Sequence, residues 1–95
     1  MRQVWKYSFA GTGQHDITLP RGAFVLSFQI QANMFTIWVL VDTKEKDLTV
    51  RRFEIIGTGW DTEREYFEYF GTVQDDGFVW HLFEVTEEQE EWGFG

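Results

Sequence analysis

The sequence predicts a mainly β fold, a small antiparallel meander that forms a barrel or a curled two-layer sheet with at most one short helix. Three observations support this prediction. Apolar and polar residues alternate along most of the chain, and turn residues separate the alternating runs. Aromatic residues, which suit pleated strands, make up 19% of the 95 residues. A chain of this length fits a single domain with a modest core.

The first half of the chain contains four expected strands, at residues 4–9, 15–20, 23–31 and 34–42. The first two runs alternate in polarity, and Pro20 ends the second of them. In the third run, AFVLSFQIQ, we expect every second residue from Phe24 to Ile30 to face the core. The fourth run, MFTIWVLVD, is apolar on both faces, which is typical of a central strand.

The second half contains three more expected strands, at residues 48–57, 65–74 and 77–85. In the first of these, Phe53 and Ile55 should point inward and Arg52 and Glu54 outward. The sequence Asp75-Asp76-Gly77 joins the last two runs, and Asp-Gly between alternating segments predicts a tight hairpin. Residues 60–67 fit a helix of one or two turns as well as they fit a strand.

The expected core combines the inward positions of these strands with two tryptophans. We predict that it contains Phe24, Leu26, Phe28, Ile37, Trp38, Phe53, Ile55 and Trp80. We expect residues 1–86 to form one β domain and residues 87–95 to form a flexible acidic tail.

The stretch Gly57-Thr58-Gly59 follows a hydrophobic strand, as the loop of a nucleotide-binding fold does. A dinucleotide fingerprint needs a third glycine, and Thr62 stands at that position. A phosphate-binding Walker loop needs a Gly-Lys pair, which the chain lacks. We therefore interpret the stretch as a turn.

Composition excludes several chemistries. The chain has no cysteine, which rules out disulfides, zinc–thiolate sites and iron–sulfur clusters. Its two histidines and its mid-strand serines form no pattern of a metal site or a catalytic triad, so we expect no cofactor and no enzyme. The net charge of −8 disfavours direct binding to duplex nucleic acid. The sequence shows no membrane segment, and the expected location is the cytoplasm.

Two sets of residues are candidates for binding. The basic residues on or near strands, with the loop tryptophan, are candidates for holding a small nucleotide: Lys6, Arg21, Arg51, Arg52 and Trp60. The alternative is that these cations pair with carboxylates on the outer face of the sheet. The loop tryptophan and the acidic tail are candidates for binding a partner protein: Trp60, Glu87, Glu88, Glu90, Glu91 and Trp92.

Six segments together resemble a family of small proteins of unknown function from tailed bacteriophages and prophages. They are, in order, VWKYSF, LPRGAFVLSFQIQ, IWVLVD, RRFEIIGTGW, YFGTVQ and WHLFE. The resemblance extends from Val4 to Glu84 and implies a phage origin for a stand-alone domain. It implies no catalytic residues, because the family has none assigned.

The leading functional hypothesis is a phage accessory protein that binds a host protein and inhibits an antiviral defence. A protein that sequesters a nucleotide signal is the second hypothesis, and a minor virion or assembly component is the third. We also expect a homo-oligomer, because residues 34–42 carry more apolar surface than one small core needs.

Overall fold

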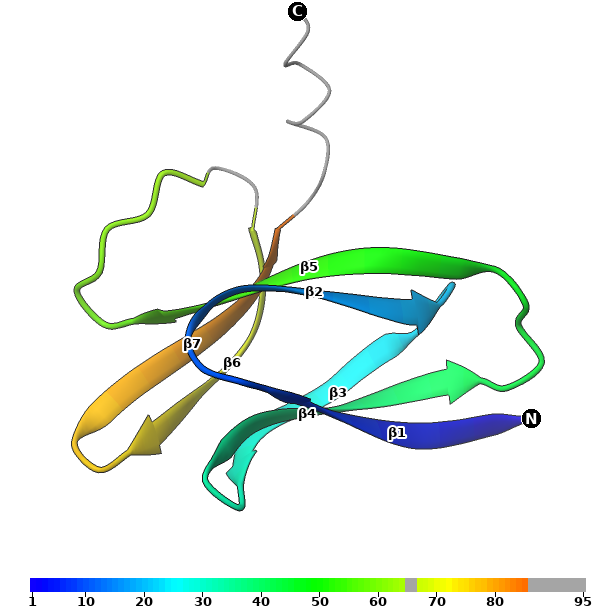
Figure 1. Ribbon diagram of the computed structural model, residues 1–95, viewed down its shortest axis with the longest axis horizontal. Helices are drawn as coiled ribbons and strands as arrows, with labels where there is room; N and C mark the ends of the chain where they lie inside the picture. The colour runs from blue at the N-terminus through cyan, green and yellow to red at the C-terminus, as the bar shows by residue number, and fades with distance from the viewer. Residues whose placement is uncertain (65–66, 86–95) are drawn as a thin grey trace, which may run out of the picture.

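The computed structural model describes residues 1–64 and 67–85. These residues form seven antiparallel strands in two sheets (Figure 1). The strands are β1 (Arg2–Phe9), β2 (Gly13–Pro20), β3 (Phe24–Gln31), β4 (Met34–Asp42), β5 (Leu48–Gly57), β6 (Phe67–Asp75) and β7 (Phe78–Val85). The fold class is therefore confirmed, in its two-layer form.

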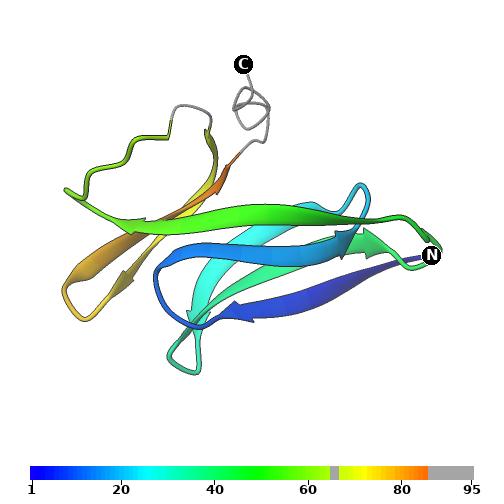
Figure 2. The ribbon, with the colours of Figure 1, turned by 45° about the horizontal axis from the view of Figure 1, so that its top comes forward.

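One sheet has three strands in the order β1-β4-β3, and the other has four in the order β2-β5-β7-β6. Only two pairs of described strands that are consecutive in sequence also pair with each other, and these are the hairpins β3–β4 and β6–β7. The links β1–β2, β2–β3 and β4–β5 cross between the sheets, and β6 is separated from β5 by β7 (Figure 1, Figure 2). These crossings bring the apolar faces of the two sheets together.

The predicted Asp-Gly hairpin is confirmed. Asp75 pairs with Phe78, and Asp76 and Gly77 between them have φ angles of 52° and 90°. Two consecutive positive φ angles define the tight turn whose twist matches that of the flanking strands. The β3–β4 hairpin turns in the same way through Ala32 and Asn33, with φ angles of 53° and 65°.

The core lies between the two sheets and is almost entirely apolar. Its buried side chains are Phe9, Leu19, Ala23, Val25, Phe28, Ile37, Val39, Val41, Phe53, Ile55, Val73 and Leu82. Four of the predicted core residues are among them: Phe28, Ile37, Phe53 and Ile55. Trp80 is half-buried and packs against this cluster.

The prediction that Phe24 and Leu26 belong to the core is wrong. Their side chains are 64% and 47% exposed, whereas Val25 between them is buried. The cause is a β-bulge, because Val25 pairs with Val39 and Ser27 with Trp38, which leaves Leu26 as an extra residue. The extra residue reverses the alternation, so that only the second half of β3 follows the predicted pattern.

Trp38 was also predicted to be in the core, but it is half-buried on the opposite face of β4. Ile37 and Val39 on either side of it are fully buried between the sheets. Because successive residues of a strand point to opposite faces, Trp38 must face away from the core. β4 is the central strand of its sheet, as predicted, but the other sheet covers only one of its two apolar faces.

The segment after β5 contains no helix in its described part. Residues 57–60 form a β-turn in which the backbone N–H of Trp60 donates to the carbonyl of Gly57 at 3.1 Å. This confirms that the Gly-Thr-Gly stretch is a turn. Residues 61–64 continue as a loop, and residues 65 and 66 of the expected helix lie outside the described ranges. No segment within those ranges forms a helix long and apolar enough to cross a membrane.

The β3 bulge gives a direct test of the fold. We expect Phe28→Ala to lower the free energy of unfolding by about 3–5 kcal/mol, because it empties a buried aromatic site. Phe24→Ala removes the same group from an exposed position of the same strand and should cost less than about 1 kcal/mol. Urea denaturation of both variants measures the difference. Equal losses would mean that β3 presents the other face to the core.

Candidate functional site

A hollow of about 280 Å³ opens at one end of the four-stranded sheet, and we refer to it as the aromatic cleft. It lies between the turn that follows β5 and the β6–β7 hairpin. Its lining residues are Gly57, Thr58, Trp60, Gly77, Phe78, Val79 and Trp80. The side chains of Trp60 and Phe78 are 49% and 62% exposed. Exposed aromatic side chains that line a hollow are the strongest binding signal in the described part of the chain.

Strand register explains why this cleft is aromatic. Trp80 pairs with Val73 of β6 and with Gly57 of β5, so its side chain lies on the inner face of the sheet. It contacts Phe35 edge-on, with ring centroids 5.8 Å apart. Phe35 is only one residue from the start of β4, so the three-stranded sheet ends there. Among residues 1–64 and 67–85, no strand opposes the inner face beyond that point, and Phe78 lies on it.

The wall of the cleft depends on the close approach of two tryptophans. The rings of Trp60 and Trp80 have centroids 5.4 Å apart and planes at 83°. Gly57 lies beneath both of them, and a Cβ there would be 2.8 Å from Nε1 of Trp60 and 3.0 Å from Cζ3 of Trp80. A glycine at this position therefore allows the indole of Trp60 to pack against that of Trp80.

Carboxylates flank the cleft. Asp75 pairs with Phe78, which places both side chains on the same face of the sheet. Asp61 follows Trp60, and Asp76 lies in the hairpin turn. Within residues 1–64 and 67–85, no salt bridge involves any of these three residues. These three carboxylates neighbour lining residues in register or in sequence without lining the cleft themselves, and no lysine or arginine lines it either.

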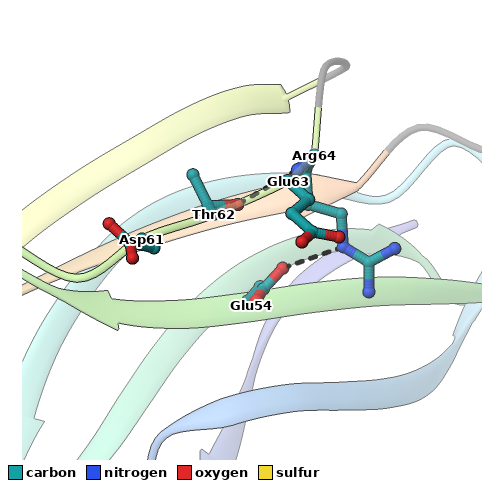
Figure 3. A pocket seen from close by; sticks show the side chains of 5 residues that line it. All are labelled: Glu54, Asp61, Thr62, Glu63 and Arg64. Atoms are coloured by element: carbon teal, nitrogen blue, oxygen red, sulfur yellow. Dashed lines mark hydrogen bonds and ion pairs between the residues drawn. The ribbon is translucent and has the colours of Figure 1, made fainter.

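A second hollow, of about 430 Å³, lies between β5 and the loop that follows Trp60 (Figure 3). Its lining residues are Glu54, Asp61, Thr62, Glu63 and Arg64. The guanidinium of Arg64 donates to Glu54 at 3.2 Å and to Gln14 at 2.7 Å. Because the only cation in this hollow is held by the protein's own acceptors, we interpret the contacts as a support for the loop.

Arg51, a predicted ligand-binding residue, points into the space between the sheets. Its guanidinium donates to both carboxylate oxygens of Glu84, at 2.7 and 2.8 Å, and to the backbone carbonyl of Ala23 at 2.6 Å. The hydrogen bonds to Glu84 raise the pKa of Arg51 above its ordinary value. The guanidinium also lies 5.7 Å from the ring centroid of Phe53. These contacts link β5, β7 and the segment that leads into β3.

The other three basic residues lie elsewhere. Arg52 points outward from β5 and pairs with Asp16 at 3.0 Å, and this contact lowers the pKa of the Asp16 carboxyl. Lys6 lies on the three-stranded sheet, where its ammonium donates to the side chain of Gln31 at 2.8 Å. Arg21 lies 3.9 Å from Asp47. The structure does not bring the four cations together, and none of them lines the cleft that contains Trp60.

The predicted partner-binding residues divide into two groups. Trp60 lies in the aromatic cleft, whereas Glu87, Glu88, Glu90, Glu91 and Trp92 lie outside the described residues. Sequence reasoning missed Phe78 as a binding candidate and assigned Trp80 wholly to the core. The exposure of Phe78 could have been predicted from its position directly after the Asp-Gly turn, because residues beside a hairpin turn are rarely covered on both faces.

His81 lies at the centre of a chain of hydrogen bonds on the outer face of the four-stranded sheet. Its Nε2 is 2.8 Å from the hydroxyl of Thr58, and its Nδ1 is 3.0 Å from that of Thr72. The Thr72 hydroxyl is in turn 2.5 Å from that of Tyr69. None of these partners of His81 is a carboxylate that orients the ring as in a catalytic triad, and we assign the network to structure. The described residues hold no group of three or more metal-ligating side chains.

The outer face of the three-stranded sheet is a second exposed apolar surface, which we refer to as the outer apolar face. Register places Val4, Leu40 and Phe24 in one row across its three strands, with Trp38 in the next row. The side chains of Val4 and Phe24 are 53% and 64% exposed. Of the 16 acidic residues in the chain, β1, β3 and β4 contain only Asp42, at the end of β4. A surface that is poor in carboxylates and rich in aromatic side chains is typical of an interface.

A family model for a domain of unknown function, DUF7352, matches residues 1–93. The chain belongs to the DUF7352 family. The matched range includes all seven strands, so the aromatic cleft and the outer apolar face of this DUF7352 domain both lie within it. No curated protein and no solved structure matches the chain.

The contact between Trp60 and Trp80 in the DUF7352 domain depends on Gly57. We expect Gly57→Ala to displace the Trp60 indole, because the new methyl group would lie under 3.0 Å from two of its atoms. The fold should persist, since the displaced side chain is on an exposed turn. Nuclear Overhauser contacts between the two indoles, present in the parent protein, should disappear in the variant. Unchanged contacts would show that the backbone moves instead.

Proposed function

We propose that the protein is a bacteriophage accessory protein that acts by binding a host protein, with the aromatic cleft as its contact surface. In this role it inhibits its target, and a host antiviral defence is the target class that we favour. The phage origin is supported by the six segments from VWKYSF to WHLFE, which resemble small phage and prophage proteins. The host cytoplasm is the compartment in which such a protein meets its target.

The single observation that carries this proposal is the exposure of Trp60 and Phe78 in the cleft. Tryptophan and other aromatic residues supply much of the binding energy at protein interfaces when they enter or form a hollow. In a small protein the exposure of two such rings costs stability, so a role in binding explains their position. The site contains no activated nucleophile, and we propose a binding protein rather than an enzyme.

No observation favours the alternative of nucleotide sequestration. A site for a nucleotide phosphate needs converging cations beside an aromatic ring. The aromatic cleft has no lysine or arginine, and the other hollow has only Arg64, which Glu54 and Gln14 engage. A role as a minor virion or assembly component requires the same protein-binding surfaces, and detection of the protein in purified virions would identify it.

The test is affinity capture from infected cells with the parent protein and two variants. Trp60→Ala removes the central aromatic residue of the cleft, and we expect it to reduce recovery of the captured partner at least tenfold, as for a side chain that contributes about 1.4 kcal/mol or more. Val50→Ala is the matched control, because Val50 is 60% exposed on β5 and does not line the cleft. Equal recovery with all three proteins would exclude the cleft as the contact surface.

We further propose that the protein self-associates through the outer apolar face. This face exposes Val4 and Phe24, includes the half-buried Trp38, and contains few of the carboxylates that elsewhere repel a second copy. Symmetric dimers are the commonest way to cover such a face. The net charge of −8 opposes association, but salt screens it over roughly 8–10 Å at ordinary ionic strength.

Sedimentation equilibrium at micromolar concentration and about 0.15 M salt tests this proposal. We expect a dimer or higher oligomer for the parent protein and a monomer for Phe24→Asp, which places a charge on the apolar face. Leu48→Asp is the control, because Leu48 is 63% exposed on the other sheet. A monomeric parent protein across the concentration range would reject self-association, and equal effects of the two variants would reject this face as the interface.

A further inference from the structure

We infer that the aromatic cleft receives a cationic side chain of the partner, either the guanidinium of an arginine or the ammonium of a methylated lysine. This inference rests on the proposed function, because it names the chemistry of the group that enters the same cleft. Three observations carry it: the arrangement of the aromatic rings, the unpaired carboxylates around them, and the lack of any cation in the cleft lining.

The ring arrangement suits a cation. The planes of Trp60 and Trp80 meet at 83°, and Phe78 lies nearly parallel to Trp80, at 22° with a centroid distance of 5.8 Å. The face of an aromatic ring is negatively polarised and its edge is positively polarised, so a cation binds over a ring face, and tryptophan provides the strongest such interaction. A guanidinium can also stack flat on an indole, which an apolar aliphatic side chain does with less specificity.

Three carboxylates near the aromatic cleft in register or in sequence contribute negative charge. Asp75 lies on the same face as Phe78, Asp61 follows Trp60, and Asp76 lies in the adjacent turn. Residues 1–64 and 67–85 provide no salt-bridge partner for these three side chains. None of the three lines the cleft, and Asp61 lines the second hollow, but the negative charge of Asp75 and Asp76 in the adjoining hairpin favours a cation over an apolar ligand. The net charge of −8 also attracts a basic partner at long range.

The protein itself contains a related contact. The guanidinium of Arg51 lies 5.7 Å from the centroid of the Phe53 ring and forms a salt bridge with Glu84. That arrangement combines an aromatic ring, a carboxylate and a cation from one chain. The aromatic cleft offers the rings, with Asp75 and Asp76 in the adjoining hairpin, and none of its lining residues is basic. A partner would therefore supply the missing group.

The test follows the indole N–H resonances of Trp60 and Trp80 in a nitrogen-labelled protein. Three capped tripeptides are titrated, with arginine, trimethyllysine or citrulline between two glycines. Citrulline has the shape of arginine with a neutral head group. We expect the arginine or the trimethyllysine peptide to shift both resonances, with binding about two- to fivefold tighter than that of the citrulline peptide. The preference between the two cations identifies the partner's side chain.

Variants provide the controls for this titration. Asp75→Asn should weaken binding of the cationic peptides and leave the citrulline peptide unaffected, and Val50→Ala should change neither. Phe78→Ala should weaken binding of all three peptides. Equal binding of arginine and citrulline peptides, or no shift with either cation at millimolar concentration, would overturn the inference. Either result would leave the proposed function intact if Trp60→Ala still loses the captured partner, so the two failures are distinguishable.

Discussion

The guanidinium of Arg51 links the two sheets at one end of the core. It donates to the carboxylate of Glu84 on β7 and to the carbonyl of Ala23 at the entry to β3. These contacts fix the chain where it crosses from the four-stranded sheet to the three-stranded one. A partly buried guanidinium without its carboxylate is costly, so the pairing of β5 with β7, which brings Glu84 to Arg51, must accompany the burial of this side chain. Its third contact, to the carbonyl of Ala23, then ties the crossing segment to the four-stranded sheet.

At the other end of the core the two sheets differ in extent. The three-stranded sheet ends near Phe35, whereas β7 and the end of β5 continue beyond it. At this end the inner face of the four-stranded sheet still carries the apolar side chains of Trp80 and Phe78, although no described strand opposes it there. Trp60 folds back over this part and covers some of it. The aromatic cleft is thus the uncovered end of the core, and its exposure follows from the unequal sheets.

Local patterns in the sequence were sufficient to predict the strands, the Asp-Gly hairpin and the inward orientation of Phe53 and Ile55. They failed at Phe24 and Leu26, because a β-bulge depends on how two strands pair and leaves no local mark in an alternating run. The position of Arg51 was readable, since it has the same phase as Phe53 in β5. Trp60 was recognised as an exposed loop aromatic. Its contact with Trp80 was not predictable, because it joins segments on different strands over a glycine.

The strand order also determines how the protein folds. The two hairpins, β3–β4 and β6–β7, are local and can form early, but β1 pairs only with β4, and β2 only with β5. The first 20 residues therefore have no strand partner until the chain has been made at least as far as β4 and β5. Sheets built from such distant pairings fold in about milliseconds to seconds, more slowly than helical bundles. During that interval the apolar faces of the completed hairpins are exposed to other newly made chains, and the net charge of −8 opposes their association.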